Sequence, residues 1–399
     1  MKWMKLLALG LQHVVAMVGA TVLVPLLTGL DVGVALVASG LGTLIYILCT
    51  KGKVPMYLGS SFAFIVAIST AGAMGGYGSA FIGLMAVGLV YVAVSIAIMF
   101  AGKQWLKDLL PPVVVGPMII IIGMSLAYVA VGSAGLDGNS GWRVPLVALI
   151  TFIFVAAIST FGKGFIKVVP FLLAIFGGYI FSMIFGLVDY GIFSEVSFFQ
   201  IPNFQFIGTY SLDFSAVLLF APIAFVTIAE HIGDHSVLGE ILEKDLIEDP
   251  GLDKTLLGDG LATLTSAMIG GPANTSYGEN IGVVAMSKTK SAKVTAVAAI
   301  FAILLGFLGY IQAFVYSIPW AVIGGVTIIL YGLIASSGVR VMIKNKVDMG
   351  QNRNLIIVST MLVIGLGGAI LTIGNFTIVG MSLAMIVGML LNKLLPQEK

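Results

Sequence analysis

The sequence predicts an all-α polytopic membrane protein with fourteen transmembrane segments in two inverted repeats of seven. Three observations lead to this prediction: the composition, the spacing of apolar runs and the distribution of basic residues. Of the 399 residues, 59% are hydrophobic and 10% are charged, and the mean hydropathy is +1.11. A soluble domain of this length does not bury so much apolar surface, so a helical membrane protein is expected.

Apolar runs of about 20 residues, the length that spans a bilayer as a helix, divide the chain into fourteen segments. The first contains Gln12 and His13 and leads directly into the second, as expected of a retained helix rather than a cleaved signal. The fifty glycines suit close packing between helices in lipid. The expected segments are 5–29, 32–50, 54–72, 79–101, 110–133, 144–162, 164–188, 213–242, 256–270, 272–287, 292–315, 317–339, 354–372 and 375–395.

The basic residues support this count independently. With the N-terminus placed in the cytoplasm, every Lys and Arg from Lys2 to Lys399 falls in an inner connection except Arg143. Inner loops of membrane proteins carry such an excess of basic residues. A missed or invented segment would move every later loop to the other side, so the count and two cytoplasmic termini are predicted together.

The longest outer connection, 189–213, contains no Lys or Arg and divides the segments seven and seven. An odd number of segments in each half places the two halves in opposite orientations. The third segment of each half is interrupted by polar or small residues, at 57–64 and from Asn274 onward. Paired broken segments in inverted repeats indicate a binding site near the membrane midplane.

The stretch from Asn274 to Lys288 is the most polar interruption of the apolar pattern. Gly270, Gly271 and Pro272 precede it, and it contains the acid Glu279 before a short apolar run. Such a stretch survives at membrane depth only when protein or a water-filled cavity surrounds it. A short helix that begins here would present its N-terminal amides to a polar solute; a re-entrant loop of purely structural use is the alternative.

Three acids, Glu230, Asp234 and Glu279, are assigned to the membrane segments. Glu230 and Asp234 are four residues apart, so they share one face of a helix. Two carboxylates so close in a low dielectric do not both ionise readily, which suits a carrier that exchanges protons. The alternative is a buried acid pair held by structural hydrogen bonds.

Other candidate side chains are weaker. His231 and His235 have a metal-ligand spacing, but no third ligand is near in sequence and Cys49 is the single cysteine, so no metal or other cofactor is expected. We expect His13 to bond another helix, at Ser60 or Ser61. Phe62 either stacks on a planar ligand or packs in the core. Ser61, Asn280 and Tyr331 are lesser candidates for the site.

The chemistry of these groups narrows the ligand. Carboxylates accept hydrogen bonds, amides at a helix start donate them, and an aromatic face stacks on flat rings. A small, flat, neutral ring with both N–H and C=O groups fits all three. A sugar would call for more aromatic platforms, and an amino acid for a fixed cation. The net charge of +2 gives no indication of a nucleic-acid partner, because the basic residues are spread between the segments. The sequence contains no nucleophile–base pair that would indicate an enzyme.

Several blocks of the sequence resemble the nucleobase–ascorbate transporter family, with the closest likeness to its bacterial uracil permeases. The likeness covers essentially the whole chain. It includes a Glu-Asn-Ile-Gly signature that starts at Glu279, although Ser287 replaces the usual Thr and Asp234 replaces a His of some relatives. The other blocks are 12–13, 19–25, 59–62, 230–234 and 244–252.

The resemblance implies a core domain formed by 1–109 and 213–315 and a gate domain formed by 110–212 and 316–399. It also implies short extended strands in segments 3 and 10. The implied activity is proton-coupled symport of uracil across the bacterial inner membrane by alternating access, in contact with lipid, and relatives give grounds for considering a homodimer. The alternatives are a xanthine or purine symporter of the same family, and an anion channel or exchanger on a related fold.

The resemblance also assigns roles to residues. Glu230 and Glu279 would hold the N–H groups of the nucleobase, and backbone amides near Tyr277 and Gly278 would meet its carbonyls. Phe62 would stack on the ring, and Ala20 would lie close by. Asp234 and His13, with Glu230, would belong to the proton-linked network.

Overall fold

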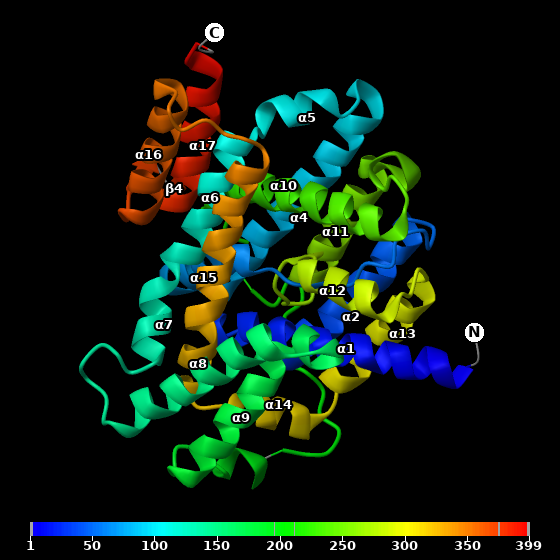
Figure 1. Cartoon of the computed structure of the whole chain (residues 1–399), viewed down its shortest axis with the longest axis vertical. Helices are drawn as coiled ribbons and strands as arrows, with labels where there is room; N and C mark the ends of the chain where they lie inside the picture. The colour runs from blue at the N-terminus through cyan, green and yellow to red at the C-terminus, as the bar shows by residue number, and fades with distance from the viewer. Residues whose placement is uncertain (1–2, 195, 211, 374–375, 397–399) are drawn as a thin grey trace.

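The computed structural model describes residues 3–194, 196–210, 212–373 and 376–396. Lys2 and Lys399 of the charge pattern, and Asn375 at the start of the fourteenth expected segment, lie outside these ranges. The protein is a bundle of helices with a few short strands (Figure 1).

The first half of the chain contains helices α1 (Trp3–Thr28), α2 (Val32–Cys49), α3 (Ile65–Gly75), α4 (Tyr77–Ala101), α5 (Gln104–Leu109), α6 (Pro112–Ser125), α7 (Ala127–Ser133), α8 (Arg143–Phe161) and α9 (Pro170–Ile184), with strand β1 (Leu58–Ser60) between α2 and α3. The second half contains α10 (Val217–Leu242), α11 (Leu252–Met268), β2 (Asn274–Ser276), α12 (Gly278–Ser287), α13 (Ala292–Gly306), α14 (Gly309–Tyr316), α15 (Trp320–Lys344), α16 (Asn352–Leu366), β3 (Ile370–Ile373), β4 (Phe376–Val379) and α17 (Gly380–Leu394). The 3₁₀ turns η1 (Phe62–Phe64) and η2 (Gly164–Val168) precede α3 and α9.

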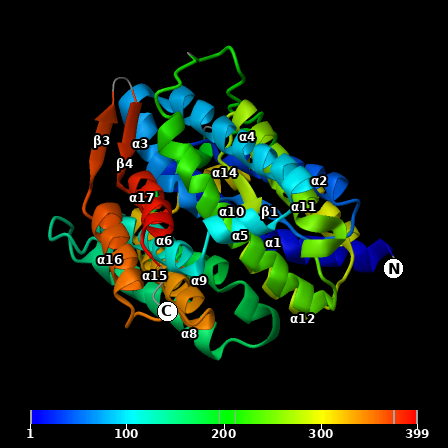
Figure 2. The same cartoon turned by 90° about the horizontal axis from the view of Figure 1, so that it is seen from above.

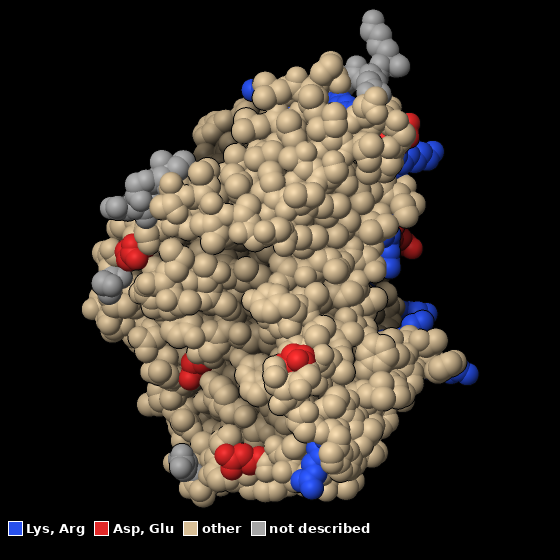
Figure 3. All heavy atoms as spheres, turned by 90° about the vertical axis from the view of Figure 1, so that its left-hand side faces the viewer, with Lys and Arg blue, Asp and Glu red and all other residues tan. Residues whose placement is uncertain are grey.

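Among the described residues, seven helical stretches are long and apolar enough to cross a membrane. They are α1, α2, α4, the successive helices α6 and α7 taken together, α8, α10 and α15, and five shorter apolar helices accompany them. Most Lys and Arg side chains visible in Figure 3 lie along one edge of the molecule, and the broad face beside that edge carries few charges. This distribution fits an apolar surface in lipid with one basic side.

Two sets of helices pack closely. In the first, α11 packs on α4 and α2, and α13 packs on α2 and α1. In the second, α15 packs on α6 and α8, while α16 packs on α17 and α6. Helix α10 packs on α4 of the first set and on α17 of the second, so it joins the two sets. The division into core and gate domains therefore stays a prediction.

Strands β1 and β2 pair antiparallel in the interior. Their paired residues Ser60 and Asn274 are 214 positions apart in the sequence. The pairing satisfies backbone groups that hydrocarbon would leave unpaired: Ser61 N–H donates to Ala273 O at 2.9 Å and Tyr277 N–H donates to Tyr57 O at 3.2 Å. A helix follows each strand, α3 after η1 on one side and α12 on the other. Each broken segment is therefore a strand followed by a short helix.

Several expected segments are not continuous helices. Segment 110–133 divides at Leu126, 164–188 begins with η2, and 292–315 breaks between α13 and α14. The largest difference concerns 354–372 and 375–395, where α16 ends at Leu366 and the hairpin β3–β4 precedes α17. Helices α16 and α17 have 15 residues each. A helix of this length rises only about 22 Å, which is less than the roughly 30 Å thickness of the hydrocarbon core.

The hairpin has a local cause. Gly367 caps α16 and Gly368 adopts a φ of +71°, which ends the helix. Ile370, Thr372 and Val379 are β-branched, and such residues favour paired strands. Figure 2 places the hairpin near the same end of the molecule as the connection that leads from α9 to α10.

Candidate functional site

A small cavity lies where the two broken segments meet α10. Its volume is about 80 Å³, and its polar wall is formed by Ser61 and Phe62 after β1, by Glu230 on α10, and by Thr275 to Glu279 around the start of α12. Apolar residues of α6 and α15 complete the wall, among them Ile119 and Ile334. The structure thus brings Ser61, Phe62, Glu230 and the α12 start, which lie far apart in sequence, to one place.

The start of α12 supplies hydrogen-bond donors to this cavity. The amides of Gly278 and Glu279 are in the first helical turn, where the helix itself offers them no acceptor. The Tyr277 amide is different, because it donates to Tyr57 O within the strand pair. The prediction that amides near Tyr277 and Gly278 meet the carbonyls of a ligand therefore depends on Gly278 and Glu279, and it stays a prediction. The Tyr277 hydroxyl is also engaged, donating to Ser60 O at 2.7 Å.

Two carboxylates reach the cavity from different elements. Glu230 projects from α10 and Glu279 from the first turn of α12. Asp234 lies one turn after Glu230 and close to the α12 start, since a Cβ built on Gly278 would lie 3.4 Å from Asp234 Oδ1. The three acids thus surround the N-terminus of α12, whose dipole favours negative charge.

A larger cavity, here called the vestibule, adjoins the small one. It has a volume of about 600 Å³ and lies between α10 and the helices α5, α6 and α15. Glu230 lines both cavities, whereas Asp234 lines only the vestibule. Lys107, Arg340 and Lys344 line its other end, which identifies that end as the basic side of the molecule.

Ala20 lies beside the site but not in the small cavity. It lines a separate crevice of about 410 Å³ between α1, α12 and the chain from Lys167 to Leu172. Gly278 and Glu279 line this crevice as well as the small cavity. Ala20 thus shares a crevice with two residues of the small cavity, and its predicted proximity to a ligand stays a prediction.

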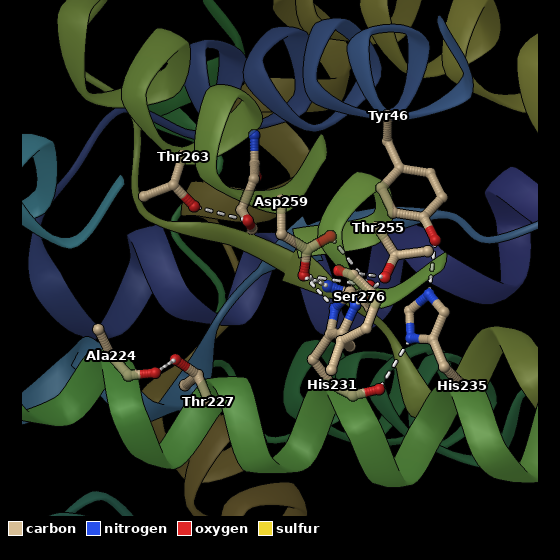
Figure 4. A network of polar contacts seen from close by, with 11 residues as sticks. Tyr46, Ala224, Thr227, His231, His235, Thr255, Asp259, Thr263 and Ser276 are labelled. Atoms are coloured by element: carbon tan, nitrogen blue, oxygen red, sulfur yellow. Dashed lines mark hydrogen bonds and ion pairs between the residues drawn. The ribbon is translucent and has the colours of Figure 1, made fainter. Parts of the chain in front are cut away.

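A buried polar network behind the cavity contains a residue that the sequence reading missed, Asp259 on α11 (Figure 4). Asp259 is fully buried and accepts hydrogen bonds from the Ser276 amide at 3.0 Å and from the Ser276 hydroxyl. His231 Nδ1 lies 2.9 Å from the same carboxylate, and its Nε2 lies 2.9 Å from Thr255 Oγ1. Asp259 therefore ties α10, α11 and β2 together.

This network includes sequence neighbours of both cavity acids. His231 directly follows Glu230, and Ser276 is three residues before Glu279. The signal for Asp259 was present in the sequence, because an acid within the expected segment 256–270 is costly unless it has partners. The identity of those partners was not present, since they come from separate segments.

Three expected candidates lie elsewhere. His13 Nδ1 bonds Leu9 O of its own helix at 2.9 Å, so the expected bond to Ser60 or Ser61 is wrong. Asn280 donates to Pro55 O at 2.9 Å and is buried, which indicates a structural role. Tyr331 is buried in an apolar cluster of α15 and does not line the small cavity.

Each ring nitrogen of the two histidines of α10 already has a hydrogen-bond partner, so neither is available to a metal ion. Their rings stack with centroids 3.8 Å apart, and His235 bonds the Tyr46 hydroxyl and His231 O. Within the described residues, no group of three or more His, Cys, Asp and Glu is placed to hold a metal.

Comparison with known proteins places this arrangement in a family. Residues 4–374 match the model of the Permease family. The chain belongs to this family, the nucleobase–ascorbate transporters. It is 49% identical over 396 residues to the uracil permease of Bacillus caldolyticus, with 98% of this chain and 92% of that one covered. It is 41% identical over 384 residues to the uracil permease of Escherichia coli (strain K12), with 95% and 89% covered.

Solved structures share the fold at low sequence identity. The transmembrane domain of the cyanobacterial bicarbonate transporter BicA superposes with a TM-score of 0.71 at 15% identity, with 96% of each chain covered. Murine Slc26a9, an anion transporter in the inward-facing state, gives a TM-score of 0.71 at 11% identity, with 99% of this chain and 68% of that one covered. The protein is thus a multi-pass permease rather than an enzyme.

Proposed function

We propose that this permease is a proton-coupled uracil symporter that carries uracil into the cell across the bacterial inner membrane. The relatives named as uracil permeases support this substrate, because their likeness extends over nearly the whole chain. Both termini would lie in the cytoplasm, as the basic residues predict. The protein would contact lipid throughout, and a homodimer remains an expectation from relatives.

The observation that carries the proposal is the chemistry of the small cavity. Glu230 and Glu279 offer acceptors for ring N–H groups, and the α12 amides offer donors for ring carbonyls. Phe62 is half-buried and lines the same cavity, so its ring is available to stack on a flat ligand. Among the described residues that line this cavity, none is Lys or Arg, which favours a neutral ligand over an anion.

Proton coupling would depend on the acids of α10. Glu230 and Asp234 are one turn apart at the boundary between the small cavity and the vestibule. Repulsion between ionised carboxylates is strong where little water separates them, so a bound proton removes one of the opposing charges. Loss of that charge would let α10 and its neighbours move against α6 and α15. His13 is less suited to this role, because its Nδ1 is held by its own helix.

The movement would be alternating access between a core and a gate domain in a fourteen-segment, inverted-repeat architecture. In this arrangement α10, α11 and the broken segments belong to the core, and α6 and α15 belong to the gate. The vestibule opens between them on the basic side. The conformation described here would therefore be the inward-facing one.

Uptake of labelled uracil into proteoliposomes tests the proposal. We expect uptake driven by an inward proton gradient and blocked by unlabelled uracil but not by xanthine or hypoxanthine. Competition by xanthine would instead assign a purine substrate to the same site. Anion flux without any nucleobase would support a carrier of the kind seen in BicA, whose fold is shared.

A further inference from the structure

Three basic side chains line the mouth of the vestibule, although the transport of a neutral base does not require a positive charge there. Lys107 on α5 and Arg340 and Lys344 on α15 all line it and are exposed. The part of the chain that the structure describes gives no ion pair for any of the three. Asp108, the acid next to Lys107, is bonded by Gln104 at 3.1 Å. Three positive charges with no ion-pair partner among the described residues thus face whatever enters from the basic side.

Two of these charges, Arg340 and Lys344, lie on the same helix as a wall residue of the small cavity. Ile334 of α15 lines the small cavity, while Ser337, Arg340 and Lys344 line the vestibule. The rise of an α-helix places Arg340 about 9 Å and Lys344 about 15 Å from Ile334 along the axis. A vestibule of about 600 Å³ is within the size range of sites for small organic ligands. One helix therefore offers a cavity wall, a hydroxyl and two cations in sequence.

We propose that the vestibule binds a nucleoside 5′-monophosphate from the cytoplasmic side, with its base toward Glu230 and its phosphate among Lys107, Arg340 and Lys344. A guanidinium binds phosphate through two parallel hydrogen bonds, and a lysine adds a point charge. The opposite orientation would place the phosphate beside Glu230 and Asp234, which repel it. In the proposed orientation, the sugar occupies the space between α10 and α15.

Such a ligand inhibits transport. It occupies the route by which the base leaves the small cavity, and it holds α10 apart from α15. A nucleotide made from the imported base thereby limits further import. Because the base end uses the nucleobase site, this inference rests on the proposed function.

The test uses the full chain in nanodiscs of phosphatidylcholine, which carries no net charge. Labelled uracil is displaced by uridine 5′-monophosphate, by uridine or by inorganic phosphate. We expect the monophosphate to displace uracil at a concentration about tenfold lower than uridine does, since a charge-assisted hydrogen bond contributes at least that factor. Arg340→Gln and Lys344→Gln each raise the required concentration of monophosphate about tenfold and leave uracil affinity unchanged.

Lys393→Gln is the matched control, because Lys393 is an exposed basic residue of α17 outside the vestibule. Equal displacement by the monophosphate and uridine, or an unchanged value in Arg340→Gln, overturns the proposal. The same phosphate chemistry occurs in lipid headgroups, so the measurement is repeated with phosphatidylglycerol in the nanodiscs. If that lipid abolishes the advantage of the monophosphate, the site belongs to the headgroup and the nucleotide assignment is overturned.

A separate measurement distinguishes failure of the proposed function. Labelled uridine 5′-monophosphate is offered to the wild-type protein and to Arg340→Gln without uracil. Retention by the wild type and loss in the variant supports the vestibule site even if uracil itself does not bind. Equal retention by both proteins overturns it.

Discussion

Glu279 is the acid on which the proposed binding of uracil depends most directly. It lies in the first turn of α12, where the helix dipole favours its negative charge, and it separates the small cavity from the crevice beside Ala20. Its partner Glu230 comes from α10, on the other side of the α12 start. A ligand between them meets one acceptor on each side, which suits a ring with more than one N–H group.

We expect Glu279→Gln to weaken uracil binding about tenfold. The amide keeps the shape of the side chain but replaces a charge-assisted hydrogen bond with a neutral one. Equilibrium binding of labelled uracil to the purified variant measures the effect. Glu240→Gln, at an exposed acid near the end of α10, is the control and should bind as the wild type does. Unchanged affinity in Glu279→Gln would remove this carboxylate from the substrate site.

Asp234 should behave differently, because it lines the vestibule and not the small cavity. We expect Asp234→Asn to keep uracil affinity within about twofold, since no direct contact with the ligand is lost. Exchange of labelled for unlabelled uracil should persist, whereas uptake should no longer respond to a proton gradient. Both rates are measured in the same proteoliposomes. Normal gradient-driven uptake by this variant would show that another group carries the proton.

At the scale of elements, the crossing of β1 and β2 determines the geometry of the site. The interruptions in segments 3 and 10 are visible in the sequence, and both sit at the cavity as that pattern predicts. The register Gly59↔Thr275 is not visible, because it depends on pairing between strands far apart in the chain. The β3–β4 hairpin could not be predicted from the sequence either. Its apolar composition is typical of a membrane helix, whereas its β-branched residues favour a strand.

Gly59 offers a test of this crossing. A Cβ on Gly59 would lie 2.6 Å from the ring of Tyr277, and that ring is held by the hydrogen bond of its hydroxyl to Ser60 O. We expect Gly59→Val to displace Tyr277 and the adjoining start of α12, and to raise the KM for uracil at least tenfold. Gly132→Val is the control, since open space surrounds Gly132. Wild-type KM in Gly59→Val would show that the crossing tolerates the shift.

Asp259 tests whether the buried network positions the cavity acids. Asp259→Asn replaces a carboxyl group with two acceptor oxygens, which serves the Ser276 and His231 bonds, by an amide with one. A buried polar group left without its partner costs about 1–3 kcal/mol, so we expect a lower thermal stability and a uracil KM raised about tenfold. Thr255→Val removes the bond of His231 Nε2 and the bond that the Thr255 hydroxyl donates to Leu252 O, leaves the Asp259 contacts in place, and should change KM less. Comparison of KM and melting temperature in the two variants checks this order, and equal KM values would contradict it.

At the scale of the whole molecule, the vestibule and the small cavity share Glu230, whereas a cavity of about 350 Å³ near Asp31, Tyr77 and Tyr210 shares no lining residue with either. The crevice beside Ala20 also shares residues with the small cavity, and Lys167 lines it. Both spaces next to the small cavity thus carry basic residues, which indicates access from the basic side. The sequence predicted which side is basic, because positive residues follow a simple rule. It could not predict which side is open, because two conformations of one sequence differ only in how the same helices pack.

Thiol labelling distinguishes these conformations. Cys49 is the single cysteine, so Cys49→Ser gives a background for Ser337→Cys, which places a thiol in the vestibule. A membrane-impermeant maleimide should label this site from the cytoplasmic face, as inside-out vesicles would report. Ser140→Cys, in the exposed connection between α7 and α8, should react only from the opposite face.

Uracil supplied with a proton gradient should slow labelling at Ser337→Cys by shifting the population toward states in which the vestibule between α10 and α15 is closed. Labelling of this site from the outer face alone would reverse the assigned orientation of the open conformation.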